Sequence, residues 1–364
     1  MTASNVTASQ RVDTAHFSYT IRPAAERDLT AVNDFYNLLT TREPGMDGET
    51  TTSSLSQLEE WWAAPRREKN TWLLVHAIAP DGSEGELIGD LEFEPQEKPG
   101  ERIAWTNLQI HPDYRNKGVG SYLYDMVVQI AGASNCTAIY MGGNTAHKLK
   151  QQFLERRGFT FDRYFWQMRL PAGVAVDPAT LPAGYTVRTY QPAQDLELFR
   201  LVRNETFADH FGSTPRTTEE MQHTVELSWF QPEGLFFASD GAGEVAGYCW
   251  SAINREEWQR RGAKIGWIEH LGVMPNHRRA GLGRSLLLTG IGYLRQECDV
   301  VELGVEGKNE RALPLYTGVG FQQHNGWVNM RKKMGSDEDD HAGLHDPRDG
   351  GARHPYPCRL LQRA

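Results

Sequence analysis

Apolar and polar residues follow two patterns along this chain, short apolar runs typical of strands and longer amphipathic runs typical of helices. In the second half, we predict strands at Tyr185–Arg188, Gly234–Ser239, Glu244–Ile253, Ala263–Val273 and Val300–Val305, and helices at Asp195–Phe207, Thr217–Ser228, Arg284–Glu297 and Asn309–Val319. Each half of the chain reads β-α-α-β-β-β-α-β-α-β. Strands that alternate with helices favour an α/β fold with a mixed sheet.

Short motifs of the first half recur in the second half, in the same order and at nearly the same separation. The matching pairs are Tyr19–Arg22 with Tyr185–Arg188, Leu87–Gly89 with Val245–Gly247, His111–Gly120 with Met274–Gly283, and Arg157–Phe159 with Val319–Phe321. Such matches indicate a tandem duplication. We therefore predict a loose leader at 1–17, a first domain at 18–170, a proline-containing linker at 171–183, a second domain at 184–333 and a disordered tail at 334–364.

Charge and cysteine content narrow the class of protein. The formal net charge is −9, which argues against general nucleic-acid binding because that function needs a basic surface to displace phosphate counterions. No apolar run approaches the ~18 residues that span a membrane, and the leader lacks the apolar stretch of a secretory signal. The four cysteines form no C-x-x-C pair. They read as reduced thiols of a cytoplasmic protein, and no metal site is predicted.

A glycine-rich loop lies between a predicted strand and a predicted helix in each half. Glycines there let the backbone turn N–H groups toward one point, and the helix that follows adds the positive end of its dipole, which suits a pyrophosphate. A Rossmann fingerprint does not fit, because it follows the first strand and has a different spacing. The candidate residues are Arg278, Arg279, Ala280, Gly281, Leu282, Gly283, Arg284 and Ser285 in the second loop, and Arg115, Asn116, Lys117, Gly118, Val119, Gly120 and Ser121 in the first. The two serines offer an additional hydroxyl donor.

These residues resemble the GNAT (Gcn5-related) acetyltransferases. The Arg-x-x-Gly-x-Gly loop after a Leu-Gly-Val-Met-Pro strand end is similar to the acetyl-CoA signature of that family, and Asn309–Tyr316 with Gly320-Phe321 is similar to its second signature. The tandem arrangement is similar to that of the mycothiol synthase group.

The resemblance implies a sheet whose fourth and fifth strands separate to admit the pantetheine arm of acetyl-CoA. In the second half these strands are Trp267–Val273 and Val300–Val305. The resemblance places further cofactor contacts at Leu271, Val273 and Asn309, and in the first half at Leu108 and Ile110. A backbone N–H group near Leu271 or Val273 could donate a hydrogen bond to the oxyanion that forms when the amine attacks the thioester.

The candidate catalytic residues lie in the second half, one from the resemblance and one from its position in a strand. Tyr316 matches the general acid that returns a proton to the leaving thiolate. Glu269 lies in strand phase with Leu271 and Val273 and is the candidate base, whereas His270 points to the opposite face. No cysteine has a histidine placed to activate it, so direct attack by a primary amine in a ternary complex is the simpler mechanism.

The first half lacks the candidate acid and base. Leu154 occupies the tyrosine position and Thr106 the glutamate position, so we predict that the first domain is not catalytic. Two alternatives remain open: an inactive acyl-CoA-binding or sensing protein, and an acyltransferase with another acyl donor or an oxygen or sulfur acceptor.

The acceptor is predicted to be a small-molecule amine, with no nucleic acid or membrane as partner. Its contacts are expected from the two early helices of the second half and the loop between them, where Asp209 could receive an ammonium group. The protein is expected to be a monomer, as a pseudo-dimer of repeats, or a homodimer.

Overall fold

The computed structural model describes residues 9–14, 17–42, 54–98 and 100–335. The first half contributes strands β1 (Gln10–Asp13), β2 (Ser18–Pro23), β3 (Thr71–Ile78), β4 (Glu84–Lys98), β5 (Glu101–Ile110), β6 (Ala138–Asn144) and β7 (Thr160–Leu170). The second half contributes β8 (Thr186–Thr189), β9 (Leu235–Ser239), β10 (Val245–Ala252), β11 (Ile265–Val273), β12 (Val300–Glu306) and β13 (Gln322–Lys333). The mixed α/β fold predicted from the sequence is confirmed.

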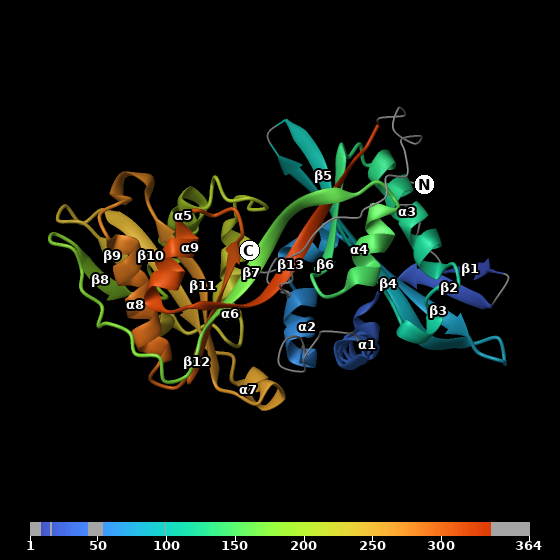
Figure 1. Cartoon of the computed structure of the whole chain (residues 1–364), viewed down its shortest axis with the longest axis horizontal. Coiled ribbons are helices and arrows are strands. Elements are labelled where there is room, and N and C mark those ends of the chain that lie inside the picture. Colours follow the sequence, from blue (N-terminus) through green and yellow to red (C-terminus); the bar gives the residue numbers. More distant parts are fainter. Residues whose placement is uncertain (1–8, 15–16, 43–53, 99, 336–364) are drawn as a thin grey trace, which may run out of the picture.

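Helices cover both faces of the sheet in each half (Figure 1). They are α1 (Leu29–Arg42), α2 (Leu55–Trp62), α3 (Val119–Ala133) and α4 (Lys148–Glu155) in the first half, and α5 (Leu196–Thr206), α6 (Thr218–Glu226), α7 (Arg255–Arg261), α8 (Leu282–Leu294) and α9 (Ala312–Val319) in the second. In the first half, α3 packs on the face of β4 that presents Leu91 and Phe93, and α1 and α2 pack on the opposite face against Trp72. In the second half, α8 and α9 share one core and α5 and α6 share another.

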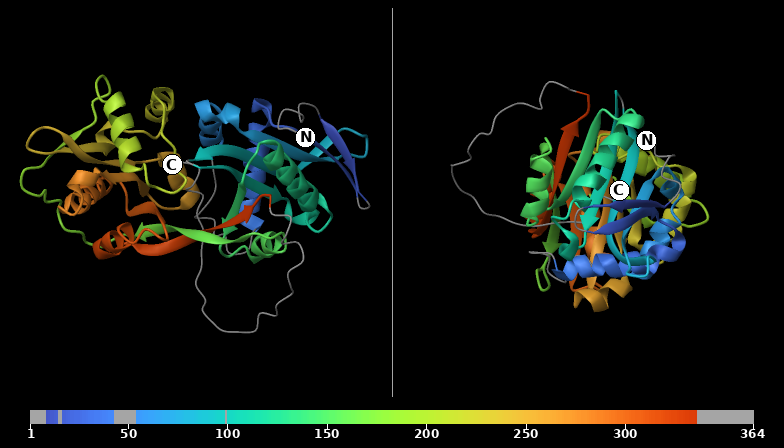
Figure 2. Two further views of the ribbon diagram at one scale, coloured as in Figure 1. Left: turned by 90° about the horizontal axis from the view of Figure 1, so that it is seen from above. Right: turned by 90° about the vertical axis from the view of Figure 1, so that its right-hand side faces the viewer.

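The described strands form one continuous 13-stranded sheet in the order β1-β2-β3-β4-β5-β6-β13-β7-β12-β11-β10-β9-β8. The closing strands are exchanged between the halves. Strand β7 of the first half pairs antiparallel with β12, and β13 of the second half pairs antiparallel with β6. Strands β7 and β13 also pair with each other, side by side between the halves (Figure 2). Each half therefore completes the sheet of the other.

The repeated Tyr-Thr-x-Arg motif has the same structural role in both halves. Arg22 on β2 makes a two-pronged ion pair with Asp28, at 2.7 and 2.8 Å, and Arg188 on β8 does the same with Asp195, at 2.5 and 2.8 Å. Each aspartate also accepts a backbone N–H from the turn that precedes the first helix. The motif thus joins the first strand of each half to the start of its first helix.

Two expectations about secondary structure are corrected. Residues 10–13, predicted to belong to a loose leader, form β1 and pair with β2, because Val12 and the nearby Phe17 pack against the core of the first half. Helix α7 is an additional element, with Asn254 capping its start and Gly262, at φ 64°, ending it. Nearly all of the predicted disordered tail, from residue 336 onward, lies outside the described residues.

Candidate active site

The two glycine-rich loops have the same backbone conformation. Arg279 and Gly281 have positive φ values of 71° and 82°, and Asn116 and Gly118 have 59° and 91°. Gly281 and Gly118 are the N-caps of α8 and α3, so each loop presents backbone N–H groups at a helix N-terminus. A Cβ added at Gly118 meets no atom within 4 Å, and one added at Gly281 meets only Cγ of Pro182 in the linker, at 3.9 Å. The residues therefore fit a bound pyrophosphate, which is the part of CoA that such a loop binds.

Three of the predicted cofactor residues, Arg278, Arg115 and Ser285, use their side chains in contacts within the protein. Arg278 donates from Nε to the carbonyl of Val273 at 3.1 Å, which braces its loop against the end of β11, and Arg115 and Ile110 repeat this contact at 3.1 Å. The Ser285 hydroxyl, predicted to face the ligand, instead donates to the carbonyl of linker residue 180 at 2.6 Å.

Three further predicted cofactor residues also use their side chains in contacts within the protein. Arg284 pairs with Asp177 of the linker at 2.7 Å, and the Ser121 hydroxyl accepts from Arg157 at 2.8 Å. These contacts form because the linker runs over the second loop and α4 leads back over the first. Asn309 uses its carbonyl oxygen to accept the N–H of Ala312 at 3.0 Å, at the start of α9.

Strands β11 and β12 separate at the predicted place. Their parallel pairing runs from Ile265 with Val300 to Ile268 with Leu303 and then stops, although β11 stays paired with β10 as far as Val273. The backbone of β11 beyond Ile268 therefore borders a gap in the sheet. Leu271 and Val273 lie along this stretch and pack against the core beneath α8. Beyond Thr106 with Met141, β5 and β6 separate in the same way.

A β-bulge lies at the candidate base. Trp250 pairs with His270 and Ser251 with Ile268, so Glu269 is the extra residue of β11. A bulge redirects the side chain and the peptide groups around it. The corresponding strand of the first half has no bulge, since β4 and β5 pair in unbroken register from Gly89 with Ile110 to Lys98 with Glu101.

Tyr316 is an 8% exposed residue of α9, beside the end of β11. Burial, and to a lesser extent Cys249, raises the pKa of its hydroxyl. Cys249 pairs with Leu271 in the sheet, which places Tyr316 close to the stretch of β11 that borders the gap. Among the described residues, its hydroxyl makes no hydrogen bond. A protonated, unengaged hydroxyl there can donate a proton.

The first half has neither group at the equivalent positions. Leu154 is buried in the core, and the Thr106 hydroxyl contacts the carbonyl of Tyr140 at 3.5 Å. Its loop residue Lys117 lies against Tyr114, beside a pocket of about 550 Å³ that Arg11 also lines. The first half thus has the glycine-rich loop and the separated strands but neither the candidate acid nor the candidate base.

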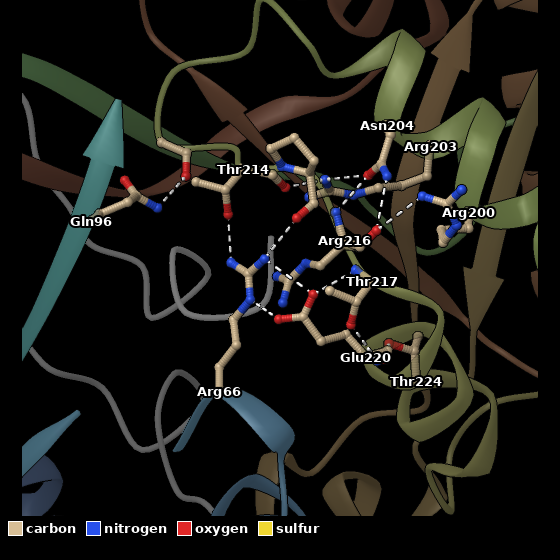
Figure 3. Close-up of polar contacts among 12 residues, drawn as sticks. Arg66, Gln96, Arg200, Arg203, Asn204, Thr214, Arg216, Thr217, Glu220 and Thr224 are labelled. Atoms are coloured by element: carbon tan, nitrogen blue, oxygen red, sulfur yellow. Dashed lines mark hydrogen bonds and ion pairs between the residues drawn. The ribbon is translucent and has the colours of Figure 1, made fainter. Parts of the chain in front are cut away.

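Helices α5 and α6 pack in a different core from α8, and Figure 3 shows polar contacts of the loop between them. His270 faces this side, with ring centroids 5.1 Å from Phe207 and 5.3 Å from Trp250. Asp209, a candidate ammonium ligand, is exposed on the loop. The buried Arg203 of α5 was not predicted, because an arginine in an amphipathic helix normally faces solvent.

The first half carries three carboxylates on one face of β4, which the sequence prediction also missed. Asp90, Glu92 and Glu94 alternate with two buried apolar residues, a period-2 pattern that could have identified them. Asp90 is fully buried and accepts from Tyr36 at 2.7 Å and Trp72 at 3.1 Å. Burial, then the neighbouring Glu92, raises the pKa of Asp90 to about 7.

Comparison with known proteins identifies the class. The acetyltransferase (GNAT) family matches residues 32–159 and 200–321, and the chain belongs to this family. It is therefore a GNAT-type acyltransferase, of a family that uses acetyl-CoA as co-substrate, and the predicted tandem arrangement is confirmed. Curated relatives are named mycothiol acetyltransferase. The protein from Stackebrandtia nassauensis is 33% identical over 262 residues, which cover 71% of this chain and 83% of the relative. The protein from Streptomyces coelicolor is 28% identical over 84% of this chain and 95% of the relative.

Solved structures share the fold. A tandem GNAT protein from the clavulanic acid biosynthesis pathway superposes with a TM-score of 0.65 at 18% identity, over 88% of this chain and all of that one. A GCN5-related N-acetyltransferase from Sphaerobacter thermophilus gives 0.63 at 21% identity, over 86% of this chain and 95% of that chain. At such identities the likeness concerns the fold alone. Within the described residues, no helix is long and apolar enough to cross a membrane, and no cluster of three or more metal-ligating side chains occurs.

Proposed function

We propose that this protein transfers an acetyl group from acetyl-CoA to the primary amine of a small molecule, by direct attack in a ternary complex, at the second half of the chain. The observation that carries the proposal is the coincidence, in that half alone among the described residues, of a strand gap, a bulged Glu269 and the buried Tyr316. The first half has the gap but neither of the other two features.

Each residue has a defined task in this proposal. Bound acetyl-CoA would supply the acetyl thioester. The backbone N–H groups of the 278–283 loop would hold its pyrophosphate, and the backbone of Leu271 and Val273 its pantetheine arm. Glu269 would accept the proton of the attacking amine, directly or through a water, and Tyr316 would protonate the departing thiolate. The Tyr316 hydroxyl is protonated at neutral pH, as a proton donor must be.

A covalent acyl-enzyme is disfavoured by the state of the thiols. Burial raises the pKa of Cys249 to about 12, and burial also raises the pKa of Cys298 to about 12. Such thiols are protonated and unreactive at neutral pH. Curated relatives are named mycothiol acetyltransferase. The amine that such an enzyme acetylates is therefore the first acceptor to assay with this protein.

Initial-rate kinetics test the proposal. The release of free CoA thiol is measured while acetyl-CoA and the amine are varied together. A ternary complex predicts double-reciprocal lines that intersect. Parallel lines, together with a chemically trapped acetyl group on the protein, would refute direct attack, and the absence of amine-dependent thiol release would refute the acetyltransferase activity of this chain.

A further inference from the structure

Arg203 is a buried arginine without a counter-charge. It is 1% exposed. Its Nη1 donates to the carbonyl of Thr214 at 2.7 Å and to Asn204 at 3.3 Å, whereas its Nη2 is buried without a hydrogen-bond partner. Among the described residues, no carboxylate lies within ion-pair distance of it. Buried charges in proteins are normally paired, because an unpaired one is strongly destabilising.

Two more unpartnered polar atoms lie in the same region. They are Nδ1 of His270 and Nε1 of Trp250, both buried, and the two rings are 5.3 Å apart. Phe207 connects them to Arg203, since it contacts His270 and lies 5.6 Å from the guanidinium. Burial, then Arg203, lowers the pKa of His270 well below its usual value, so this histidine is neutral and adds no charge.

Two further arginines lie near Arg203. Arg66 and Arg216 accompany Arg203, whereas the nearby carboxylates are Glu220 and Glu94. Glu220 pairs with Arg66, and burial raises the pKa of Glu94 although Arg66 and Arg216 act to lower it. Burial, then Arg66 and Arg203, lowers the pKa of Arg216 to about 9, which is the expected effect of like charges held close together.

Both halves hold this arrangement in place (Figure 3). Asn204 binds both backbone groups of Arg216, donating to its carbonyl at 2.9 Å and accepting its N–H at 2.8 Å. From the first half, Arg66, on the short helix Pro65–Lys69, binds Glu220, the Thr214 hydroxyl and the Pro215 carbonyl. Contacts from both halves thus hold these arginine-bearing segments in place.

We propose that Arg203 and Arg216 form an anion-recognition site for the acceptor, so that the acetylated amine belongs to a molecule that also carries a carboxylate or phosphate group. His270 belongs to this site and directly follows Glu269 in β11, where the bulge changes the direction of the side chains. In this proposal the amine end of the acceptor lies near the candidate base and the anionic end against the arginines. This inference rests on the proposed acetyl transfer at the second half.

Direct anion binding tests the site without relying on turnover. The full chain is saturated with CoA, so that the glycine loops are occupied, and thermal unfolding is followed while inorganic phosphate is titrated. A ligand that binds only the folded protein raises the unfolding temperature as its concentration rises. We expect a saturable increase in the wild type, and its loss in Arg203→Gln and in Arg216→Gln. Arg255→Gln is the matched control, because Arg255 is an exposed arginine of the same half that pairs with Glu297.

Paired amines then test the acceptor class. Cysteamine is compared with cysteine, and glucosamine with glucosamine 6-phosphate, by acetyl-CoA-dependent thiol release. Loss of a charge-assisted hydrogen bond predicts that each arginine variant lowers kcat/KM for the anionic member roughly 10- to 100-fold and leaves the neutral member unchanged. Arg203→Lys should restore part of the preference, which a merely structural role of Arg203 would not predict.

The outcomes separate the two proposals. If phosphate has no saturable effect on the CoA-bound wild type, the anion site is overturned. Equal or better turnover of the neutral amines also overturns it, but in that case the acetyltransferase proposal stands. Failure of CoA to bind would instead overturn the proposed function. If Arg203→Gln does not fold, Arg216→Gln decides, because Arg216 is only partly buried.

Discussion

The two halves of this protein share a framework and differ on one face of the sheet. The Arg–Asp pair at the first helix and the glycine loop with two positive φ values occur in both. Along the first helix, however, Tyr36 occupies the position of Arg203, and on the neighbouring strand Asp90 occupies that of Tyr248. The first half thus buries a carboxylate on the face of the sheet where the second half buries a guanidinium. Duplication thus preserved the loop geometry and left the face opposite α3 and α8 free to diverge.

Loss of the proton donor should have the largest effect and should be confined to the second half. Tyr316→Phe is expected to lower kcat by roughly 10²–10⁴, as for other general acids, while acetyl-CoA affinity is retained. Tyr293→Phe, at a partly buried tyrosine of α8, is the control. The assay is CoA thiol release with calorimetry for binding. Unchanged turnover in Tyr316→Phe would remove the proton-donor assignment.

The closing strands pair with the sheet of the other half in two places, β7 with β12 and β13 with β6. These two pairings should differ in how much their side chains stabilise the fold. Glu302 on β12 is fully buried and accepts from Arg169 and Gln167 of β7 and from Arg261 of α7. Glu302→Gln should reduce the free energy of unfolding by about 3–5 kcal/mol, because it leaves the buried Arg261 and the partly buried Arg169 without their counter-charge. At the equivalent position of β6, Tyr140→Phe should cost less than about 1 kcal/mol. Urea unfolding measures both. Equal effects of the two substitutions would mean that backbone hydrogen bonds alone stabilise both strand pairings.

The first half should influence acceptor binding through Arg66. Arg66→Ala removes its contacts with the α5–α6 loop and should raise the acceptor KM roughly 10-fold, with the acetyl-CoA KM unchanged. Arg42→Ala, which removes an exposed ion pair with Asp113 in the same half, should change neither value. A parallel rise of both KM values would indicate a general structural defect.

The buried carboxylate of the first half should give the smallest effect, a pH dependence of stability. The folded protein holds a proton on Asp90 up to about pH 7, whereas the unfolded chain releases it near pH ~4. The stability that comes from the bound proton of Asp90 is therefore fully present below about pH 4 and is lost as the pH rises through about 7. Asp90→Asn should flatten the fall in melting temperature across that range, and Asp34→Asn, exposed on α1, should not. Identical profiles for wild type and Asp90→Asn would contradict the buried proton.

Local patterns predicted the elements well, whereas features that depend on pairing required the structure. The duplication and the strand separation followed from motif order and family resemblance. The bulge at Glu269 could not be predicted, since it exists only as a two-against-one count between neighbouring strands. Strand exchange was missed for the same reason, because sequence periodicity does not name the partner of a closing strand. Helix α7 was missed although Asn254 and Gly262 are ordinary start and stop signals.

Side-chain direction limited the prediction of the site. The loop glycines have the predicted conformation, but Ser285 and Arg284 contact the linker, whose path no local pattern specifies. Arg203 was missed because its burial depends on the α5–α6 loop that folds over it. Residues whose role depends on backbone conformation were thus easier to identify than those whose role depends on tertiary contacts.

Matched substitutions in the two loops test most directly the claim that the second half carries the chemistry. Gly281→Asp and Gly118→Asp each place a negative side chain in a left-handed loop position of one half. Acetyl-CoA turnover and calorimetric binding are measured for both. We predict that Gly281→Asp abolishes turnover and that Gly118→Asp retains it, whether or not a second CoA site is lost. Loss of turnover in Gly118→Asp with normal turnover in Gly281→Asp would contradict the assignment.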